Sequence, residues 1–408
     1  MKVLFVAMFF PPAGGGGVQR PLKFASHLAE LGFDVHVLAP DDPKWPFRDD
    51  SVEIPPAITV HRARNLGPRP RLLALELART EGLARLGLWA HVLFRGALVP
   101  DGSVLWELTA IPAAIRIVRR ERIEVVVSSS SPGSVHLAGA AAKRVTGVRW
   151  VADLRDMLVS HIDRRHELRG ERLLARLVAR NADAIVCAYP AIAREMAELS
   201  PRGRLEVIEN GCDFDDFAGL EYRPAERFRL THTGSTLGRR DMRPVLDGLA
   251  RADGDVLARF VGGMRPDDRA YAESLGLGDR LQVVPFLPRS EALAFQRDTE
   301  ALLLIHPDTE GRGKDVLPGK VFEYLAAERP ILAVVAPDGE TAARLRETGA
   351  AVVVPPADPD AIAAGISELE SRWRAGDLNG TKLPAELSAR LSRRARAERL
   401  AELLRSLR

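Results

Sequence analysis

Residues 2–39 read KVLFVAMFFPPAGGGGVQRPLKFASHLAELGFDVHVLA, and this stretch decides the fold. It opens with an apolar run at 2–10, passes four glycines at 14–17, and enters a helical pattern at 18–31. A second apolar run follows at 35–39. Continuous apolar runs are typical of strands covered on both faces, so the order strand, helix, strand predicts a parallel α/β unit.

The same alternation continues along the chain and restarts halfway. Predicted strands follow at 123–129, 149–154, 184–188, 228–233, 257–261, 281–287, 301–306, 331–335 and 351–354, and predicted helices include 242–251, 320–327 and 341–347. Two such patterns predict two Rossmann-like doubly wound domains facing a central cleft. We expect these domains at 1–212, with an insertion at 62–100, and at 213–384. A final helix at 385–408 is expected to return to the first domain.

Composition excludes several classes of protein. A chain of 408 residues is too long for one ordinary hydrophobic core, so we expect more than one domain. Of these residues 46% are hydrophobic, as in globular proteins. The net charge of +3 comes from charges of both signs spread along the chain, which argues against a nucleic-acid partner. The two cysteines, Cys187 and Cys212, provide no disulfide framework and no metal-ligand spacing. No apolar run reaches the ~18–20 residues that span a bilayer, and the first ten residues are interpreted as a buried strand, not an export signal. The sequence therefore predicts a cytoplasmic protein.

The four glycines at 14–17 form the first candidate binding element. They follow a strand and open a helix, whose N-terminal amides and partial positive charge suit a phosphate, a sugar hydroxyl or a carboxylate. Gly16 and Gly17 are the candidate donor-binding positions, and a flexible turn is the alternative. The glycine spacing differs from the dinucleotide fingerprint, so a nicotinamide dehydrogenase is not expected.

The second candidate is VLPGKVFEYLAAERPIL, residues 316–332. Pro318 and Gly319 precede a predicted helix in which Lys320 and Glu323 share one face. A cation and unpaired amides at the helix start fit a diphosphate, and a carboxylate one turn later fits the hydroxyls of a ribose. A surface Lys/Glu pair is the alternative.

This segment resembles the donor-site motif of family 4 glycosyltransferases, which have the GT-B fold and retain the anomeric configuration. The motif carries two acidic residues separated by seven positions, here Asp315 and Glu323. The resemblance implies that Asp315, in place of the usual Glu, contacts the donor sugar and that Glu323 binds the ribose. Three further stretches resemble the family, VADLRDML (151–158), IENGCDFDDF (208–217) and LTHTGSTLGRRDMRPVLDGLA (230–250). The last contains Gly234 and Arg240, and we expect Arg240 and Lys320 to hold the donor diphosphate.

Four more residues are candidates because they lie at or after the ends of predicted strands, at the edge where α/β proteins bind ligands. Asp156 is expected to contact the acceptor during catalysis, and Asp153 and His136 to lie on the acceptor side. His306 is expected to contact the donor. Packing inside the domain is the alternative for His136. For the aspartates the alternative is that one of them forms a structural ion pair with Arg155.

The resemblance implies transfer of a sugar from a nucleoside diphosphate sugar to a hydroxyl acceptor, with the donor on the second domain and the acceptor on the first. Arg240, Lys320 and the helix N-terminus would stabilise the leaving diphosphate, so no essential metal and no further cofactor are expected. A nucleotide-sugar 2-epimerase and a catalytically silent binding protein are the alternatives.

The insertion at 62–100 mixes arginine with leucine, Trp89 and Phe94. One interpretation is an amphipathic helix packed on its own domain. The other is a basic, apolar surface that serves the acceptor side or contacts the inner face of a membrane.

Overall fold

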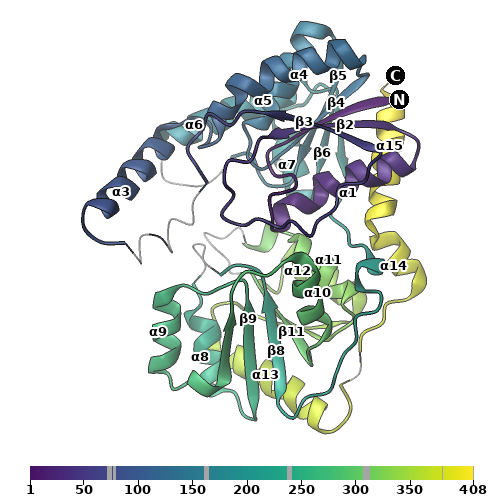
Figure 1. Cartoon of the computed structure of the whole chain (residues 1–408). Coiled ribbons are helices and arrows are strands. Elements are labelled where there is room, and N and C mark those ends of the chain that lie inside the picture. The colour runs from purple at the N-terminus through teal and green to yellow at the C-terminus, as the bar shows by residue number, and fades with distance from the viewer. Residues whose placement is uncertain are drawn as a thin grey trace. The chain divides into compact units, whose positions relative to one another are not determined.

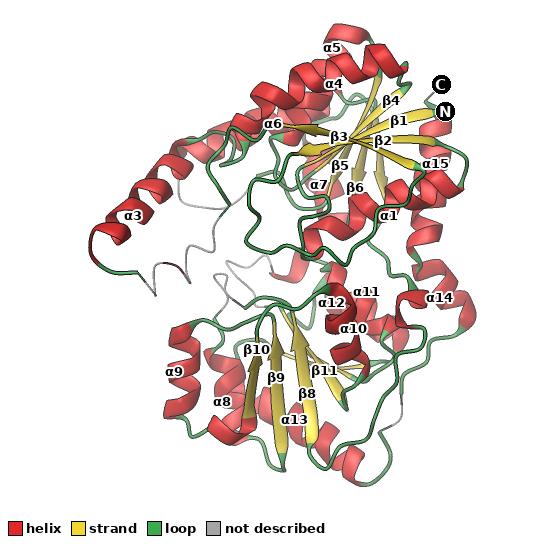
Figure 2. Ribbon diagram, in the orientation of Figure 1, coloured by secondary structure: helices red, strands yellow, loops and turns green. Residues whose placement is uncertain are grey.

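The computed structural model describes residues 1–70, 76, 80–159, 165–236, 241–306, 313–378 and 380–407 (Figure 1). The chain splits into two compact units. Unit 1 comprises Met1–Asn210 and Arg393–Arg408, and unit 2 comprises Gly211–Ser392. The sequence predicted these two boundaries between residues 212 and 213 and between residues 384 and 385. Each unit is built around one parallel sheet (Figure 2).

The sheet of unit 1 has seven strands in the order β3-β2-β1-β4-β5-β6-β7, all paired in parallel. Strand β1 lies inside this sheet and buries its side chains on both faces, as its continuous apolar run predicts. The strands are β1 Lys2–Ala7, β2 Asp34–Pro40, β3 Ile58–Ala63, β4 Val125–Ser129, β5 Arg149–Leu154, β6 Ala184–Cys187 and β7 Arg204–Val207.

Helices cover this sheet on both sides (Figure 2). Helix α5 packs closely because Gly139 leaves room for an indole: a Cβ atom there would lie 2.2 Å from Trp150 Nε1. The last helix, α15, packs against α1 and buries Leu400, Leu403 and Leu404. The helices are α1 Gly16–Glu30, α3 Gly82–Ala97, α4 Glu107–Glu121, α5 Val135–Thr146, α6 Arg165–Asn181, α7 Pro190–Glu198 and α15 Arg393–Ser406, with a 3-10 turn at Val104–Trp106.

The sheet of unit 2 has six parallel strands in the order β10-β9-β8-β11-β12-β13. Its strands are β8 Phe228–Thr233, β9 Val256–Val261, β10 Leu281–Val284, β11 Ala301–Ile305, β12 Ile331–Val334 and β13 Ala351–Val354. Its helices are α8 Arg243–Arg251, α9 Pro266–Ser274, α10 Arg289–Arg297, α11 Gly319–Ala326, α12 Glu340–Thr348, α13 Pro359–Arg374 and α14 Ala385–Leu391, with 3-10 turns at Phe214–Phe217, Gly278–Arg280 and Gly313–Asp315.

Several predicted boundaries were wrong. The strand expected at 2–10 ends at Ala7, and the helix expected at 18–31 begins inside the glycine run at Gly16. The continuous helix expected at 385–408 is two helices, because Ser392 has extended backbone angles. At this break Cys212 forms a bridge with Ser392 and donates its amide to Leu391 O at 3.2 Å.

The insertion at 62–100 contains the end of β3 and the helix α3, while 71–75 and 77–79 lie outside the described residues. Leu88 is the one fully buried side chain of α3. Leu83, Leu86 and Leu93 are 85%, 64% and 71% exposed. Packing on the domain is therefore the wrong interpretation for the apolar face of α3, which points to solvent.

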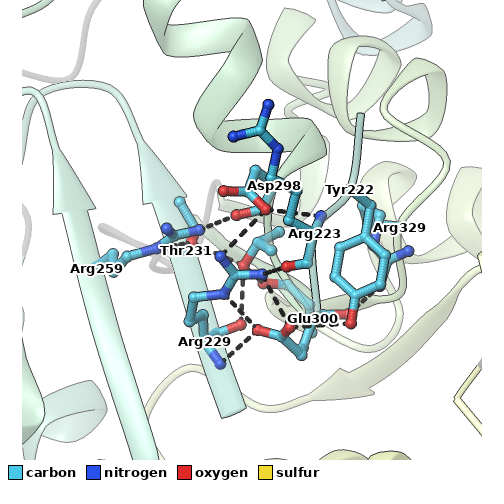
Figure 3. Close-up of polar contacts among 10 residues, drawn as sticks. Tyr222, Arg223, Arg229, Thr231, Arg259, Asp298, Glu300 and Arg329 are labelled. Carbon is cyan, nitrogen blue, oxygen red and sulfur yellow. Dashed lines mark hydrogen bonds and ion pairs between the residues drawn. The ribbon is translucent and has the colours of Figure 1, made fainter. Parts of the chain in front are cut away.

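A buried charge cluster joins the amino ends of strands in unit 2 (Figure 3). Glu300, which directly precedes β11, is completely buried. Its carboxylate lies 2.8 Å from Arg229 Nε of β8 and accepts the Tyr222 hydroxyl at 3.0 Å. The Arg329 guanidinium stacks on the Tyr222 ring at 3.8 Å. This cluster fixes the segment that enters β8 at the edge of the sheet opposite to its carboxyl ends.

Candidate functional site

Two glycine turns meet at the carboxyl edge of the unit 2 sheet. Gly234 follows β8 with φ +110°, and Gly262 follows β9 with φ +121°. Both angles lie in the region that favours glycine. A Cβ atom at Gly262 would lie 2.7 Å from the carbonyl carbon of Gly234, so only glycine allows the two turns to touch.

Lys320 reaches this turn from the first residues of α11. A Cβ atom at Gly234 would lie 2.6 Å from Lys320 Nζ, so the ammonium lies almost directly on the Gly234 backbone. Lys320 Nζ is also 3.4 Å from His232 Nε2, and His232 Nδ1 is 2.9 Å from Leu303 O. A carbonyl oxygen can only accept a hydrogen bond, so Nδ1 carries the proton of the neutral His232 ring, and Nε2 accepts a hydrogen bond from the Lys320 ammonium. The buried His232 therefore orients Lys320, a role that the sequence did not indicate.

Glu323 lies one helical turn beyond Lys320 and is held by Arg289 of α10. Arg289 donates to Glu323 Oε1 at 2.7 Å and to Asp216 Oδ2 at 2.9 Å. Burial by itself would lower the pKa of Arg289, but the charges of Glu323 and Asp216 and the hydrogen bonds to them raise it above its ordinary value. The ion pair fixes the Glu323 carboxylate on the same helix that carries Lys320. Sequence reasoning missed Arg289, which lies 34 positions away.

The remaining donor-side candidates surround the start of α11. Gly319 is its first residue, after Pro318, and no side chain caps the helix there. Asp315 ends the 3-10 turn that precedes it, and His306 follows β11, where its amide donates to Val334 O at 3.1 Å. Arg240 lies outside the described residues.

The glycine loop of unit 1 is tied down by an arginine. Gly15, with φ +92°, is the N-cap of α1 and provides no side-chain cap. Gly16 is the first residue of α1, and Gly17 packs on the Phe9 ring. Arg155 donates to Gly17 O, and also to the backbone carbonyls of Ser130 and Ser131 in the loop after β4. Arg155 thus joins the glycine loop to the loop after β4.

The two aspartates at the end of β5 have different environments. Asp153 is 1% exposed and accepts bonds from Arg20 at 2.7 Å and Ser129 Oγ at 2.7 Å. Asp156 is exposed and accepts the Ser131 hydroxyl at 2.6 Å. The structure therefore pairs Asp153 with Arg20, not Arg155, and leaves Asp156 at the surface.

His136 lies in the core of unit 1 with no exposed surface. Its Nδ1 is 2.8 Å from Ser128 Oγ, which also accepts the Trp150 Nε1 proton at 2.8 Å. Burial lowers the pKa of His136 to about 3, so the ring is neutral at physiological pH. This environment favours the packing interpretation over acceptor contact.

Neither a metal cluster nor a spanning helix occurs in the described ranges. They contain no group of three or more His, Cys, Asp or Glu side chains that could hold a metal ion. Within the same ranges no helix combines the length and apolarity needed to cross a membrane. Cys187 and Cys212 are both buried and neither forms a disulfide, and burial raises the pKa of Cys187 to about 12.

Comparison with known proteins gives a family-model match to part of the chain and a common fold. Residues 15–211 match the family model described as a glycosyl transferase 4-like domain. No curated protein matches the chain.

Solved structures match the whole chain at low identity. Sucrose-phosphate synthase from Thermosynechococcus elongatus superposes with a TM-score of 0.72 and 16% identity over 100% of this chain and 98% of that one. HepE of Anabaena in complex with UDP superposes with a TM-score of 0.67 and 18% identity over 100% of both chains. A glycosyltransferase from Rickettsia africae superposes with a TM-score of 0.64 and 13% identity, over 99% of this chain and 98% of that one. The chain therefore has the GT-B fold of two Rossmann-like α/β domains, and its residues 15–211 match the glycosyl transferase 4-like domain.

Proposed function

We propose that this protein is a glycosyltransferase that moves a sugar from a nucleoside diphosphate sugar to a hydroxyl acceptor, with retention of the anomeric configuration. The observation that carries the proposal is the Lys320 ammonium, which lies against Gly234 with the Glu323 carboxylate one turn away. HepE, which shares the fold, has been solved with UDP and with UDP-glucose, and this supports a nucleotide sugar as the donor.

The proposed chemistry uses charge stabilisation in unit 2. As the bond from the anomeric carbon to the diphosphate oxygen breaks, negative charge grows on the leaving diphosphate. Lys320 and the uncapped amides of α11 from Gly319 would stabilise that charge, with Arg240 as a second cation. The acceptor hydroxyl attacks from the same face, forms the new glycosidic bond, and passes its proton to the departing diphosphate. This scheme requires neither a metal ion nor a further cofactor.

The remaining candidates have binding roles in the proposal. Glu323 binds the ribose hydroxyls while Arg289 holds its carboxylate in position. Gly16 and Gly17 at the start of α1 contribute to donor binding. Asp156 at the surface of unit 1 contacts the acceptor. Asp315 contacts the donor sugar, and His306 contacts the donor.

Isothermal titration calorimetry with UDP and with other nucleoside diphosphates tests donor binding. Lys320→Ala should weaken binding by about 1.5–3 kcal/mol, the range for a hydrogen bond between charged groups. It should lower turnover more than it raises the donor KM, because the charge is larger in the transition state. Lys382→Ala is the matched control, because Lys382 is an exposed lysine of the same unit. Equal binding by the two variants would refute the assignment of Lys320.

Product analysis separates transfer from the alternatives. The wild-type protein should release nucleoside diphosphate faster when a glycan or other hydroxyl acceptor is present, and the product should retain the anomeric configuration. An epimerised nucleotide sugar formed without acceptor would identify an epimerase instead. Tight nucleotide binding with no turnover across an acceptor panel would identify a silent binding protein.

A further inference from the structure

Helix α3 carries an apolar face that points away from its own unit. Five apolar side chains, spaced by one, three or four residues, share one side of this helix. They are Leu83, Leu86, Trp89, Leu93 and Phe94. They are between 48% and 85% exposed. A helix of a globular unit normally turns its apolar stripe to the core. Figure 1 shows α3 projecting beyond the rest of unit 1, away from the strands.

Helix α6 carries a matching basic face. Four arginines recur every three or four residues along α6 and form a row about 16 Å long on one side of it. This row, called the arginine ladder below, consists of Arg169, Arg172, Arg176 and Arg180. All four are exposed, and Leu173 between them is 63% exposed. Among the residues that the structure describes, none of the four forms an ion pair.

The segment that leaves α3 packs against α6 within unit 1. Val99, which follows α3, contacts Gly170 of α6. The contact is so close that a Cβ atom at Gly170 would lie 2.1 Å from Val99 Cγ1. Val99 is itself 41% exposed, and Gly170 lies between the first two arginines of the ladder. The end of α3 therefore lies near the first part of α6, the helix that carries the arginine ladder.

We propose that α3 and the arginine ladder of α6 dock unit 1 on an anionic lipid surface. The apolar face of α3 would lie in the headgroup region, where leucine, phenylalanine and tryptophan side chains are buried by interfacial helices. The ladder would contact lipid phosphates, and each arginine near such a surface adds about 1 kcal/mol. This surface goes beyond the proposed sugar transfer and does not depend on it.

The charge pattern favours lipid over a second copy of the chain. Residues 82–97 contain Arg85 and Arg95 but no aspartate or glutamate. The α3 helix of a second copy would therefore offer no carboxylate to the arginine ladder of α6. An anionic bilayer supplies the missing negative charge.

Vesicle flotation of the full chain tests the proposal. The protein should float with vesicles of equal parts phosphatidylcholine and phosphatidylglycerol at low salt. Binding should fall at high salt and with phosphatidylcholine alone. R172Q/R176Q should bind the anionic vesicles about thirtyfold more weakly, since two arginines are removed. R116Q/R119Q is the matched control, because it removes two exposed arginines from α4 of the same unit.

A second pair of variants tests the apolar face. Leu93→Ser with Phe94→Ser should abolish flotation, whereas Leu108→Ser with Val145→Ser, which changes exposed apolar residues elsewhere in unit 1, should not. Circular dichroism checks that every variant folds. The proposal is overturned if the wild type fails to float at low salt, or if the control variants lose as much binding as the test variants. Sedimentation showing a dimer that the Leu93/Phe94 variant dissociates, with no vesicle binding, would identify a protein interface.

Discussion

The buried imidazole of His136 should make the stability of unit 1 depend on pH in a defined window. Its pKa is about 3 in the folded chain against an ordinary value of 6.5. Between these values the unfolded chain binds more protons than the folded one, so acid favours unfolding. The stability that the neutral ring contributes is complete above about pH 6.5 and is lost as the pH falls toward 3. Between pH 7 and pH 5 this group should lower the free energy of unfolding by about 2 kcal/mol.

The variant His136→Gln isolates this effect because it keeps a polar group near Ser128 and removes the titration. It should be less stable than the wild type at pH 7, and the difference should shrink by about 2 kcal/mol at pH 5. Burial, and then the charge of Asp101, raise the pKa of Glu107 well above its ordinary value. The contribution of Glu107 to stability therefore depends on pH in the opposite direction to that of His136. That contribution is common to both proteins and cancels in the difference.

Urea unfolding followed by tryptophan fluorescence measures the two stabilities. Four of the five tryptophans lie in unit 1, so this signal reports mainly on the unit that contains His136. A difference between variant and wild type that stays constant from pH 7 to pH 5 would refute the reasoning. It would mean that the ring is accessible to protons in the folded chain.

Three further substitutions have defined expected outcomes. Gly139→Ala should destabilise the protein by about 1–3 kcal/mol, because its Cβ atom would meet the Trp150 indole. An unchanged melting temperature would contradict that packing. Gly234→Ala should cost about 1–3 kcal/mol of backbone strain and should weaken nucleotide binding by displacing Lys320. Calorimetry that shows wild-type affinity would contradict the second part. Glu323→Ala should weaken binding of nucleoside diphosphates by about 1.5–3 kcal/mol, and equal affinity for them in a folded variant would disprove the ribose contact.

Most strands of the two sheets were predictable from the sequence. The strands at 149–154, 228–233 and 351–354 have the predicted bounds, and the last of them is an edge strand with the wholly apolar sequence AVVV. Two of the four edge strands, β3 and β7, were missed. Their sequences, ITVHRA and RLEV, are half polar, since one side of an edge strand has no neighbouring strand.

The candidate site was predictable only where its residues are close in sequence. Lys320 and Glu323 lie on one helical turn, so their spacing already places them together. His232 and Arg289, which orient them, are 88 and 34 residues away in the chain. No local pattern marks such partners, because the sheet order alone brings β8 and α10 beside α11. His136 was considered for an acceptor role because it follows a strand, and that position does not reveal whether a helix buries its side chain.

The return of the chain to unit 1 has a consequence for synthesis. Helix α15 packs on α1, yet all 182 residues of unit 2 are made between Asn210 and Arg393. At ribosomal rates of about 5–20 residues per second, roughly 10–40 s separate the two parts of unit 1. Unit 2 can therefore finish folding first, while the surface of α1 that α15 covers remains open to chaperones. A nonsense mutation near residue 392 would leave that surface permanently uncovered and would make the first unit, not the second, the target of degradation.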